Sequence, residues 1–254
     1  MYETVCYKKP FLKDVIVRIN FASPIEGFQR ALPPKVASSA LFNFPISEPQ
    51  KLQEQTVTIT HESIENQRGE SMQWTYHGRE REKTLHITSE YVSLVLKSYK
   101  SYEAMRLELD PILDVIFETQ KDLVASRVGV RFVNVLDMPH DGDPFAWGDF
   151  VRPDMLATIN AHKATGILSR AFQIVEFNNN GRSARFQFGL ANPDFPAPVR
   201  RRQFVIDIDA YYQGALTLAD VSTEIDAAHT TIQQLFEASI TDATRALMGT
   251  QNVE

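Results

Sequence analysis

The sequence predicts an α+β fold in which one β-α-β-β-β-α unit occurs twice. Val15-Ile16-Val17-Arg18-Ile19 recurs as Val128-Gly129-Val130-Arg131-Phe132, at an offset of 128 − 15 = 113 residues. The same offset relates Val92 to Val205, in the last strand of each half. Hairpin-linked strands imply a mainly antiparallel sheet, and the long helices are expected to pack on one of its faces. We therefore expect an arm at residues 1–14 and repeat units at 15–124 and 125–254, within one compact pseudo-twofold domain.

The first half begins with a strand at residues 15–21, where apolar and polar side chains alternate. A short helix at 24–32 is expected to end at Pro33-Pro34, with a loop at 35–52. Alternation then predicts strands at 53–61 and 72–77 joined by a turn at 66–69, and a long strand at 84–97. A helical segment follows at 101–123, and its Asp110-Pro111 pair predicts a kink or a second helix start.

The second half repeats this order, beginning with a strand at 127–136 and a helix near 151–162. A hairpin is predicted from 168–177 and 182–190, because its turn contains Asn180-Gly181, a pair that tolerates positive φ. A strand at 201–210 and a continuous final helix from about Thr217 to Met248 complete the unit. Part of this helix could extend past the sheet, so a homodimer through that part is a hypothesis.

The strand and helix periods also predict which side chains are buried. Alternate strand positions and the apolar stripes of the two long helices should form the core. The expected core includes Val17, Trp74, Leu94, Ile116, Val130, Phe132, Phe186, Ile206, Ile232 and Phe236.

Polar side chains at the alternate positions of the same strands define the candidate site. If the valines and phenylalanines of these strands face the helices, the charged residues between them face away from the helices. The same open face is expected to carry the polar side chains of Thr56, Thr58, Gln73, Thr75 and His77. Arginine is suited to recognising an anionic or polar partner because its planar fork donates two parallel hydrogen bonds. The candidate binding residues are Arg18, Arg127, Arg131, Arg185, Asp207 and Asp209.

Two other interpretations of these residues remain open. The face could be a hydrated sheet surface whose charges pair with one another, Asp207 with Arg18 or Arg131. Alternatively, Asp207 and Asp209, two positions apart on one strand face, could share a divalent metal. The metal interpretation lacks a third acidic ligand and a glycine-rich phosphate loop, so no metal and no cofactor are expected.

No catalytic constellation stands out, so an enzyme is not favoured. The six histidines form no zinc-binding spacing, and His140-Asp141-Gly142-Asp143 is equally well explained as a turn. The nucleophile-elbow, phosphate-loop and dinucleotide motifs are absent. The single cysteine, Cys6, excludes an internal disulfide and favours a reducing compartment. Without a signal peptide or a membrane-spanning run, a cytoplasmic protein without a membrane partner is expected.

Three segments resemble a family of bacterial proteins of about this length. They are the strand R-V-G-V-R-F-V-N at residues 127–134, the strand F-V-I-D-I-D at 204–209, and the closing helix with His229, Phe236-Glu237 and Ile240-Thr241. The family is sporadically distributed and its function is uncharacterised. The resemblance implies a soluble bacterial protein and brings no activity with it.

The favoured function is a non-enzymatic binding or interaction protein. Its open sheet face would recognise a protein, a peptide or a small anionic ligand. A nucleic-acid-associated protein that uses the same face is the alternative, although the net charge of −6 is unusual for a general nucleic-acid binder. A metal-dependent hydrolase or nuclease ranks third.

Overall fold

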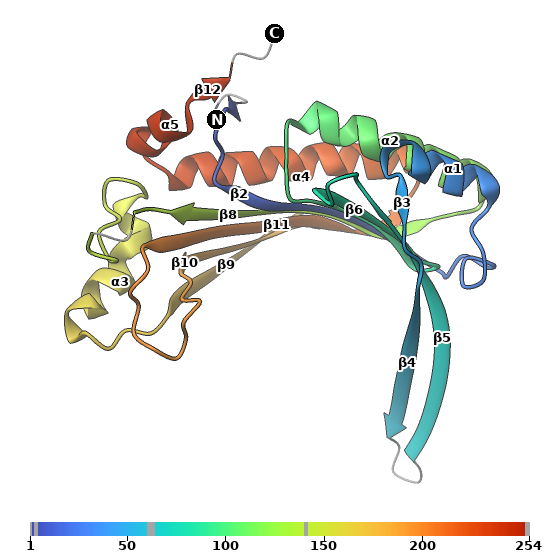
Figure 1. Ribbon diagram of the computed structural model, residues 1–254, viewed down its shortest axis with the longest axis horizontal. Coiled ribbons are helices and arrows are strands. Elements are labelled where there is room, and N and C mark those ends of the chain that lie inside the picture. Colours follow the sequence, from blue (N-terminus) through green and yellow to red (C-terminus); the bar gives the residue numbers. More distant parts are fainter. Residues whose placement is uncertain (1, 3–4, 60–63, 140–141, 252–254) are drawn as a thin grey trace. The chain divides into compact units, whose positions relative to one another are not determined.

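A computed structural model of the chain has an α+β fold with mostly antiparallel strands and, in the part of the chain that it describes, five α-helices (Figure 1). The structure describes residues 2, 5–59, 64–139 and 142–251. The chain divides into two compact units. Unit 1 contains residues 1–15, 129–212 and 224–254, and unit 2 contains residues 16–128 and 213–223.

Unit 2 is built on strands that follow in the order β3-β5-β6-β7-β2. Their bounds are β2 Leu12–Phe21, β3 Ile46–Ser47, β5 Ile64–His77, β6 Lys83–Ile87 and β7 Tyr91–Leu96. The predicted alternation is confirmed in β2, where Val17 and Ile19 are fully buried while the positions between them are partly exposed. Trp74 is only partly buried, against expectation, and its indole Nε1 donates to the carbonyl of the buried Phe28 at 2.8 Å.

The hairpin that joins β4 (Gln50–Ile59) to β5 differs from the sequence prediction. β4 pairs with β5 along its whole length, from Gln50 opposite Gln73 to Ile59 opposite Ile64. The turn expected at residues 66–69 is therefore wrong, because these residues belong to β5. His61, which was expected to end the first of these strands, lies outside the described residues. Figure 1 shows that β4 and β5 extend away from the other strands of unit 2.

The first helix also lies elsewhere than expected. Residues 24–32 form turns, with Gly27 at φ 88°, and the helix α1 runs over Pro34–Asn43 instead. Pro33-Pro34 begins this helix rather than ending one. Proline is favoured at the first helical position, where its missing N–H has no helical partner to lose.

The helix α2 (Tyr102–Thr119) is continuous through Asp110-Pro111. The expected second helix start is wrong, because Asp110 does not cap a new helix. Its carboxylate instead accepts hydrogen bonds from the Nε of Arg106, one turn earlier, while Ser101 caps the helix through the N–H of Ala104. Pro111 is exposed and removes only one helical hydrogen bond.

Unit 1 has its strands in the order β8-β11-β10-β9. Their bounds are β8 Ala125–Asp137, β9 Ala171–Asn179, β10 Arg182–Leu190 and β11 Gln203–Leu216. The predicted β9–β10 hairpin is confirmed, and its turn places Asn180 at φ 52° and Gly181 at φ 84°. In place of one helix near 151–162, a 3₁₀ turn at Pro153–Leu156 precedes the short helix α3 (Ala157–His162).

The final helix is interrupted, so the predicted continuous helix is wrong. It consists of α4 (Leu218–Ser239) and α5 (Asp242–Met248). Between them Ile240 forms a β-bridge with Val151, and Thr241 caps α5 through the N–H of Thr244. The bridge and the cap replace the helical hydrogen bonds at the break.

The chain ends of unit 1 pair with each other. Within residues 1–14, expected to form an arm, lies the strand β1 (Cys6–Tyr7), which pairs antiparallel with β12 (Thr250–Gln251). Most of the expected core is buried, including Val130, Ile206 and Ile232. Phe132 and Phe236 are only partly buried. The ring of Phe132 faces the imidazole of His229, with centroids 5.9 Å apart, and Phe236 lies in the last turn of α4. Within the described residues, no helix is both long and apolar enough to cross a membrane.

Candidate functional site

The strands β8, β10 and β11 of unit 1 bring four of the six candidate residues together. Arg185 lies opposite Asp209 in the antiparallel register of β10 and β11, and Gln187 lies opposite Asp207. The neighbouring positions Phe186 and Ile208 are buried on the other face of the strands. The alternation of side chains along each strand therefore separates a polar face from the apolar core.

Arg131 and Asp207 form a two-pronged ion pair on this polar face. The guanidinium donates from Nε at 2.8 Å and from Nη2 at 2.5 Å to the two carboxylate oxygens. The side chain of Asp207 is 10% exposed and that of Arg131 is 47% exposed. The hydrogen bond to Asp207 raises the pKa of Arg131, and the charges of Asp209 and Asp14 add to this effect.

This pair fixes the orientation of the guanidinium without using all of its donors. An arginine carries five N–H groups, and Asp207 takes one from Nε and one from Nη2. Within the part of the chain that the structure describes, Nη1 has no acceptor. The Nη1–Nη2 edge is thus a preoriented fork for a second acceptor.

A small cavity of about 90 Å³ lies beside this fork. It is lined by Arg131, Arg185, Gln187, Asp207 and Asp209. Arg185 is 52% exposed, and its Nε lies 3.8 Å from the carboxylate of Glu176. Pockets that enclose a whole small molecule are usually about 300–1,000 Å³. This cavity is therefore the size of one chemical group rather than of a complete ligand.

The other two candidate residues belong to unit 2 and do not line this cavity. The guanidinium of Arg18 stacks on the ring of Tyr91, 3.7 Å from its centroid, and its Nε donates to Asn20 Oδ1 at 3.1 Å. Arg127 is half-buried near the start of β8. The side chains of Thr56 and Thr58, also expected on this face, are not among those that the structure describes. His140 and Asp141 of the H-D-G-D segment lie outside the described residues as well.

The polar face of unit 2 carries a chain of side-chain hydrogen bonds, and His77 at its margin lies 3.3 Å from the carboxylate of Glu48. The hydroxyl of Tyr91 donates to Gln73 Oε1 at 3.0 Å, and Gln73 Nε2 donates to Thr75 Oγ1 at 3.3 Å. Thr75 Oγ1 lies 3.1 Å from Nδ1 of His86. Burial, and then the charge of the neighbouring His77, lower the pKa of His86. Sequence analysis missed Tyr91 and His86, although His86 lies between the buried Leu85 and Ile87 in β6 and Tyr91 precedes the buried Val92 in β7.

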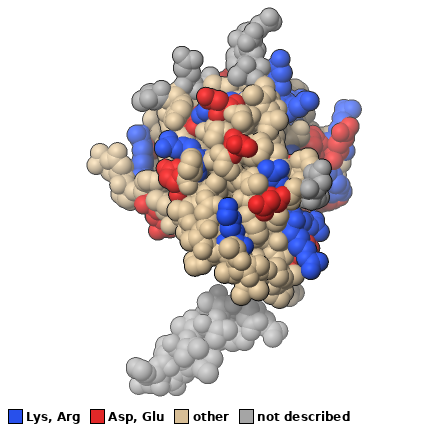
Figure 2. All heavy atoms as spheres, turned by 90° about the vertical axis from the view of Figure 1, so that its left-hand side faces the viewer, with Lys and Arg blue, Asp and Glu red and all other residues tan. Residues whose placement is uncertain are grey.

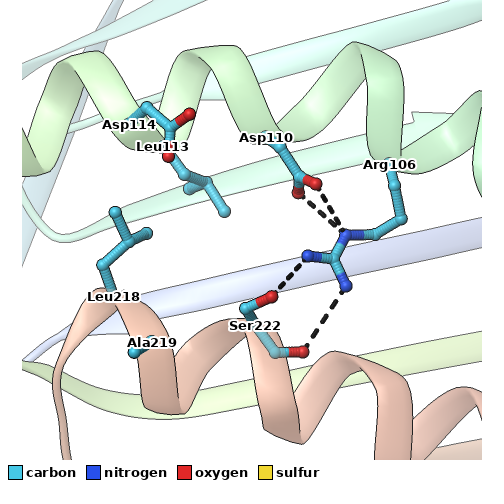
Figure 3. A pocket seen from close by; sticks show the side chains of 7 residues that line it. All are labelled: Arg106, Asp110, Leu113, Asp114, Leu218, Ala219 and Ser222. Atoms are coloured by element: carbon cyan, nitrogen blue, oxygen red, sulfur yellow. Dashed lines mark hydrogen bonds and ion pairs between the residues drawn. The ribbon is translucent and has the colours of Figure 1, made fainter.

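A second cavity, of about 430 Å³, lies in unit 2 between α2 and the first turns of α4 (Figure 3). It is lined by Arg106, Asp110, Leu113, Asp114, Leu218, Ala219 and Ser222. Arg106 spans its end: Nε donates to Asp110 at 2.8 Å, Nη1 to the Tyr102 hydroxyl at 3.0 Å, and Nη2 to Ser222 Oγ at 2.6 Å. The pKa of Arg106 is raised because these hydrogen bonds outweigh its burial. The i,i+4 spacing of Arg106 and Asp110 was the only sequence signal for this cluster.

A buried carboxylate joins the C-terminal helices of unit 1 to its N-terminal strand. The side chain of Glu237 is 3% exposed and accepts from Arg245 Nε at 2.8 Å and from the Tyr7 hydroxyl at 2.6 Å. Burial, and then Glu237, raise the pKa of Tyr7. The polar partners of this cluster belong to the fold itself, including the backbone carbonyl of Glu237, which accepts from Arg245 Nη2 at 2.6 Å. Removing one partner would leave a buried charge without compensation, so the cluster has a structural role.

No cluster of three or more metal-binding side chains occurs within the described residues. Asp207 is occupied by Arg131, one of the pairings that the sequence leaves open. On the face drawn in Figure 2, basic and acidic side chains are interspersed. The surface in that view therefore offers local pairs of opposite charge rather than a field of one sign.

Comparison with known proteins adds little to this geometry. No family model matches the chain. A segment of 120 residues, 46% of the chain, is 31% identical to part of the adhesion G-protein coupled receptor V1 of Danio rerio. The chain spans about 2% of the length of that receptor. This likeness establishes neither a family nor an activity for the chain.

Proposed function

We propose that the protein is a non-enzymatic binding protein that recognises a carboxylate group of a protein partner in the cavity of unit 1. The single observation that carries this proposal is the half-used guanidinium of Arg131 beside the half-exposed Arg185. Two arginines that border one cavity can each donate to a planar acceptor. The partner would contribute the side chain of an aspartate or glutamate, or a chain-terminal carboxylate.

The size of the cavity supports a macromolecular partner. At about 90 Å³ it has room for a group of a few heavy atoms, whereas a whole small-molecule ligand usually needs several times more space. A protein partner can place one side chain there and bind elsewhere on the polar face with the rest of its surface.

The charge of the cavity argues against nucleic acid as the partner. Its two arginines are balanced by two aspartates, and the protein carries a net charge of −6. A phosphate backbone needs an excess of basic side chains, which release its counterions. Nucleic acid is therefore kept as an outcome of the test and not as a second function.

The proposal includes the duplication and its geometry. We regard the V-x-V-R echo as the trace of a duplicated unit whose helices pack on one face of its strands. In each unit the echoed strand carries an arginine, Arg18 in β2 and Arg131 in β8. The single Cys6 and the bacterial resemblance support the bacterial cytoplasm as the setting of this function.

The test uses a peptide array with matched peptides that contain Glu, Gln or a C-terminal carboxylate. Arg185→Gln should weaken binding of the Glu peptides about ten- to hundredfold, because a hydrogen bond to a charged group contributes about 1.5–3 kcal/mol. Arg152→Gln is the matched control, since Arg152 is 51% exposed and lies 3.4 Å from a surface carboxylate. It should leave binding unchanged.

Two results would contradict the proposal. Equal binding of Glu and Gln peptides would remove the carboxylate as the recognised group. Binding of a single-stranded oligonucleotide that falls steeply with salt, and is lost in Arg185→Gln, would replace the protein partner by nucleic acid. Both variants should keep the wild-type melting temperature, which excludes unfolding as the cause of lost binding.

A further inference from the structure

The strand β9 ends the strand order of unit 1 and leaves one backbone edge free. It pairs with β10 from Ala171 opposite Leu190 to Asn179 opposite Arg182. Within the described residues no strand pairs with its other edge. The free edge therefore presents a row of N–H and C=O groups that can bind another strand.

This edge lacks the features that usually prevent strand addition. Lysine and proline are the common protecting residues at sheet edges, and the sequence A-F-Q-I-V-E-F-N-N of β9 contains neither. Its one charged residue, Glu176, lies 3.8 Å from Arg185 of the adjacent strand. Three large apolar residues are exposed along the strand: Ile174 by 50%, Val175 by 40% and Phe177 by 45%.

The row of apolar side chains in unit 1 ends at β9, where it is exposed. Val175 lies opposite Phe186, which is 8% exposed, and Phe177 lies opposite Ala184, which is 4% exposed. Val175 and Phe177 thus continue the row of core side chains to the margin of the sheet and leave it exposed there. An occupant of the edge would have to cover this row with apolar side chains of its own.

We propose that a second copy of the chain occupies this edge, with β9 pairing antiparallel to β9 of the partner about a twofold axis at Val175. The second copy supplies the same apolar row, so the two cores become continuous across the axis. Pairing centred on Val175 places Glu176 opposite the other copy's Ile174 and so avoids two like charges directly opposite each other. An isologous contact of this kind closes after two copies, because each copy uses its β9 edge once.

Sedimentation of the whole chain over a range of concentrations tests the dimer. The wild type should form a concentration-dependent dimer, and Ile174→Lys should raise its dissociation constant at least about tenfold, since an edge lysine opposes strand addition. Ile167→Lys is the matched control, because Ile167 is 74% exposed in unit 1 and lies outside every strand. That variant should dimerise like the wild type.

Two further measurements make the test independent of how well Ile174→Lys folds. Hydrogen exchange of the wild type should slow in residues 171–179 as the concentration rises. Val175→Cys should form an intermolecular disulfide on oxidation, because directly opposite residues of antiparallel strands have Cα atoms about 4.5–5.5 Å apart. The wild type, with Cys6 alone, controls for other cross-links.

A wild type that stays monomeric at every concentration would overturn the proposal. So would a dimer whose residues 171–179 exchange at the monomer rate, because the contact would then lie elsewhere. A disulfide through Val175→Cys that forms no faster than the wild-type background would refute the register centred on Val175.

Discussion

Arg106 in unit 2 and Arg131 in unit 1 both pair with an aspartate, yet their remaining donors differ in surroundings. Arg106 is 16% exposed, and its two terminal nitrogens donate to Tyr102 and Ser222 as well. Arg131 is 47% exposed, and among the described residues only its Nε and Nη2 find acceptors. The same pair of residue types therefore forms a closed polar clamp in one unit and a partly open ion pair in the other.

The two arginines differ in how many of their donors the fold occupies, and we propose that this number separates a structural arginine from one that binds a partner. A guanidinium whose donors all point at fold partners has nothing left for a ligand. A guanidinium fixed along one edge keeps its orientation and can donate from the next edge without losing further side-chain entropy. Substitutions can test this distinction by separating effects on stability from effects on binding.

The largest effect is expected at Arg245, which marks the fully structural end of the comparison. Arg245→Met leaves the carboxylate of Glu237, 3% exposed, with Tyr7 as its remaining side-chain partner. The loss should be about 3–5 kcal/mol of unfolding free energy, measured by urea denaturation. Arg201→Met is the control, because Arg201 and its partner Asp194 are 48% and 46% exposed and should contribute at most about 1 kcal/mol. Equal losses in the two variants would contradict the role of burial.

The second prediction concerns the two compared arginines directly. Arg106→Met should cost about 2–3 kcal/mol of stability, because Asp110 and Ser222 lose a shared partner, and should leave peptide binding unchanged. Arg131→Met should cost about 1–2 kcal/mol, since water can enter the opened cavity and hydrate Asp207, and should weaken peptide binding at least about tenfold. Urea denaturation and the peptide array measure the two quantities. Weaker peptide binding in Arg106→Met would refute the distinction.

Strand alternation predicted much of the polar face, because it depends only on local sequence. The patterns R-V-G-V-R-F and D-I-D place Arg131, Asp207 and Asp209 between buried neighbours, as the structure shows for Val130 and Ile208. The Asn180-Gly181 turn was predictable for the same reason, since its backbone conformation is a local preference.

The features that sequence analysis missed depend on partners far along the chain. Arg106 meets Ser222, which lies 116 residues away, and Tyr7 meets Glu237, which lies 230 residues away. The break after Ser239 likewise involves a distant partner, because Ile240 forms a β-bridge with Val151. Pro33-Pro34 was misassigned because proline can both end one helix and begin another, and local sequence does not choose between them.

The smallest predicted effect extends the comparison to pH. The polar face of unit 1 contains arginine–carboxylate pairs, whereas that of unit 2 contains His86, whose pKa burial lowers below the ordinary value of 6.5. The imidazole of His86 therefore binds a proton more readily in the unfolded chain than in the folded chain. The contribution of neutral His86 to the unfolding free energy is complete above pH 6.5 and is lost as the pH falls through the folded-state pKa. His86→Gln should flatten the decline of unfolding free energy below pH 6.5 by up to one proton, at most about 1.4 kcal/mol per pH unit. Urea denaturation on both sides of that pH measures the slope.

The exposed His162 supplies the control, because His162→Gln should keep the wild-type slope. A slope that stays unchanged in His86→Gln would show that the protonation of His86 is not coupled to folding.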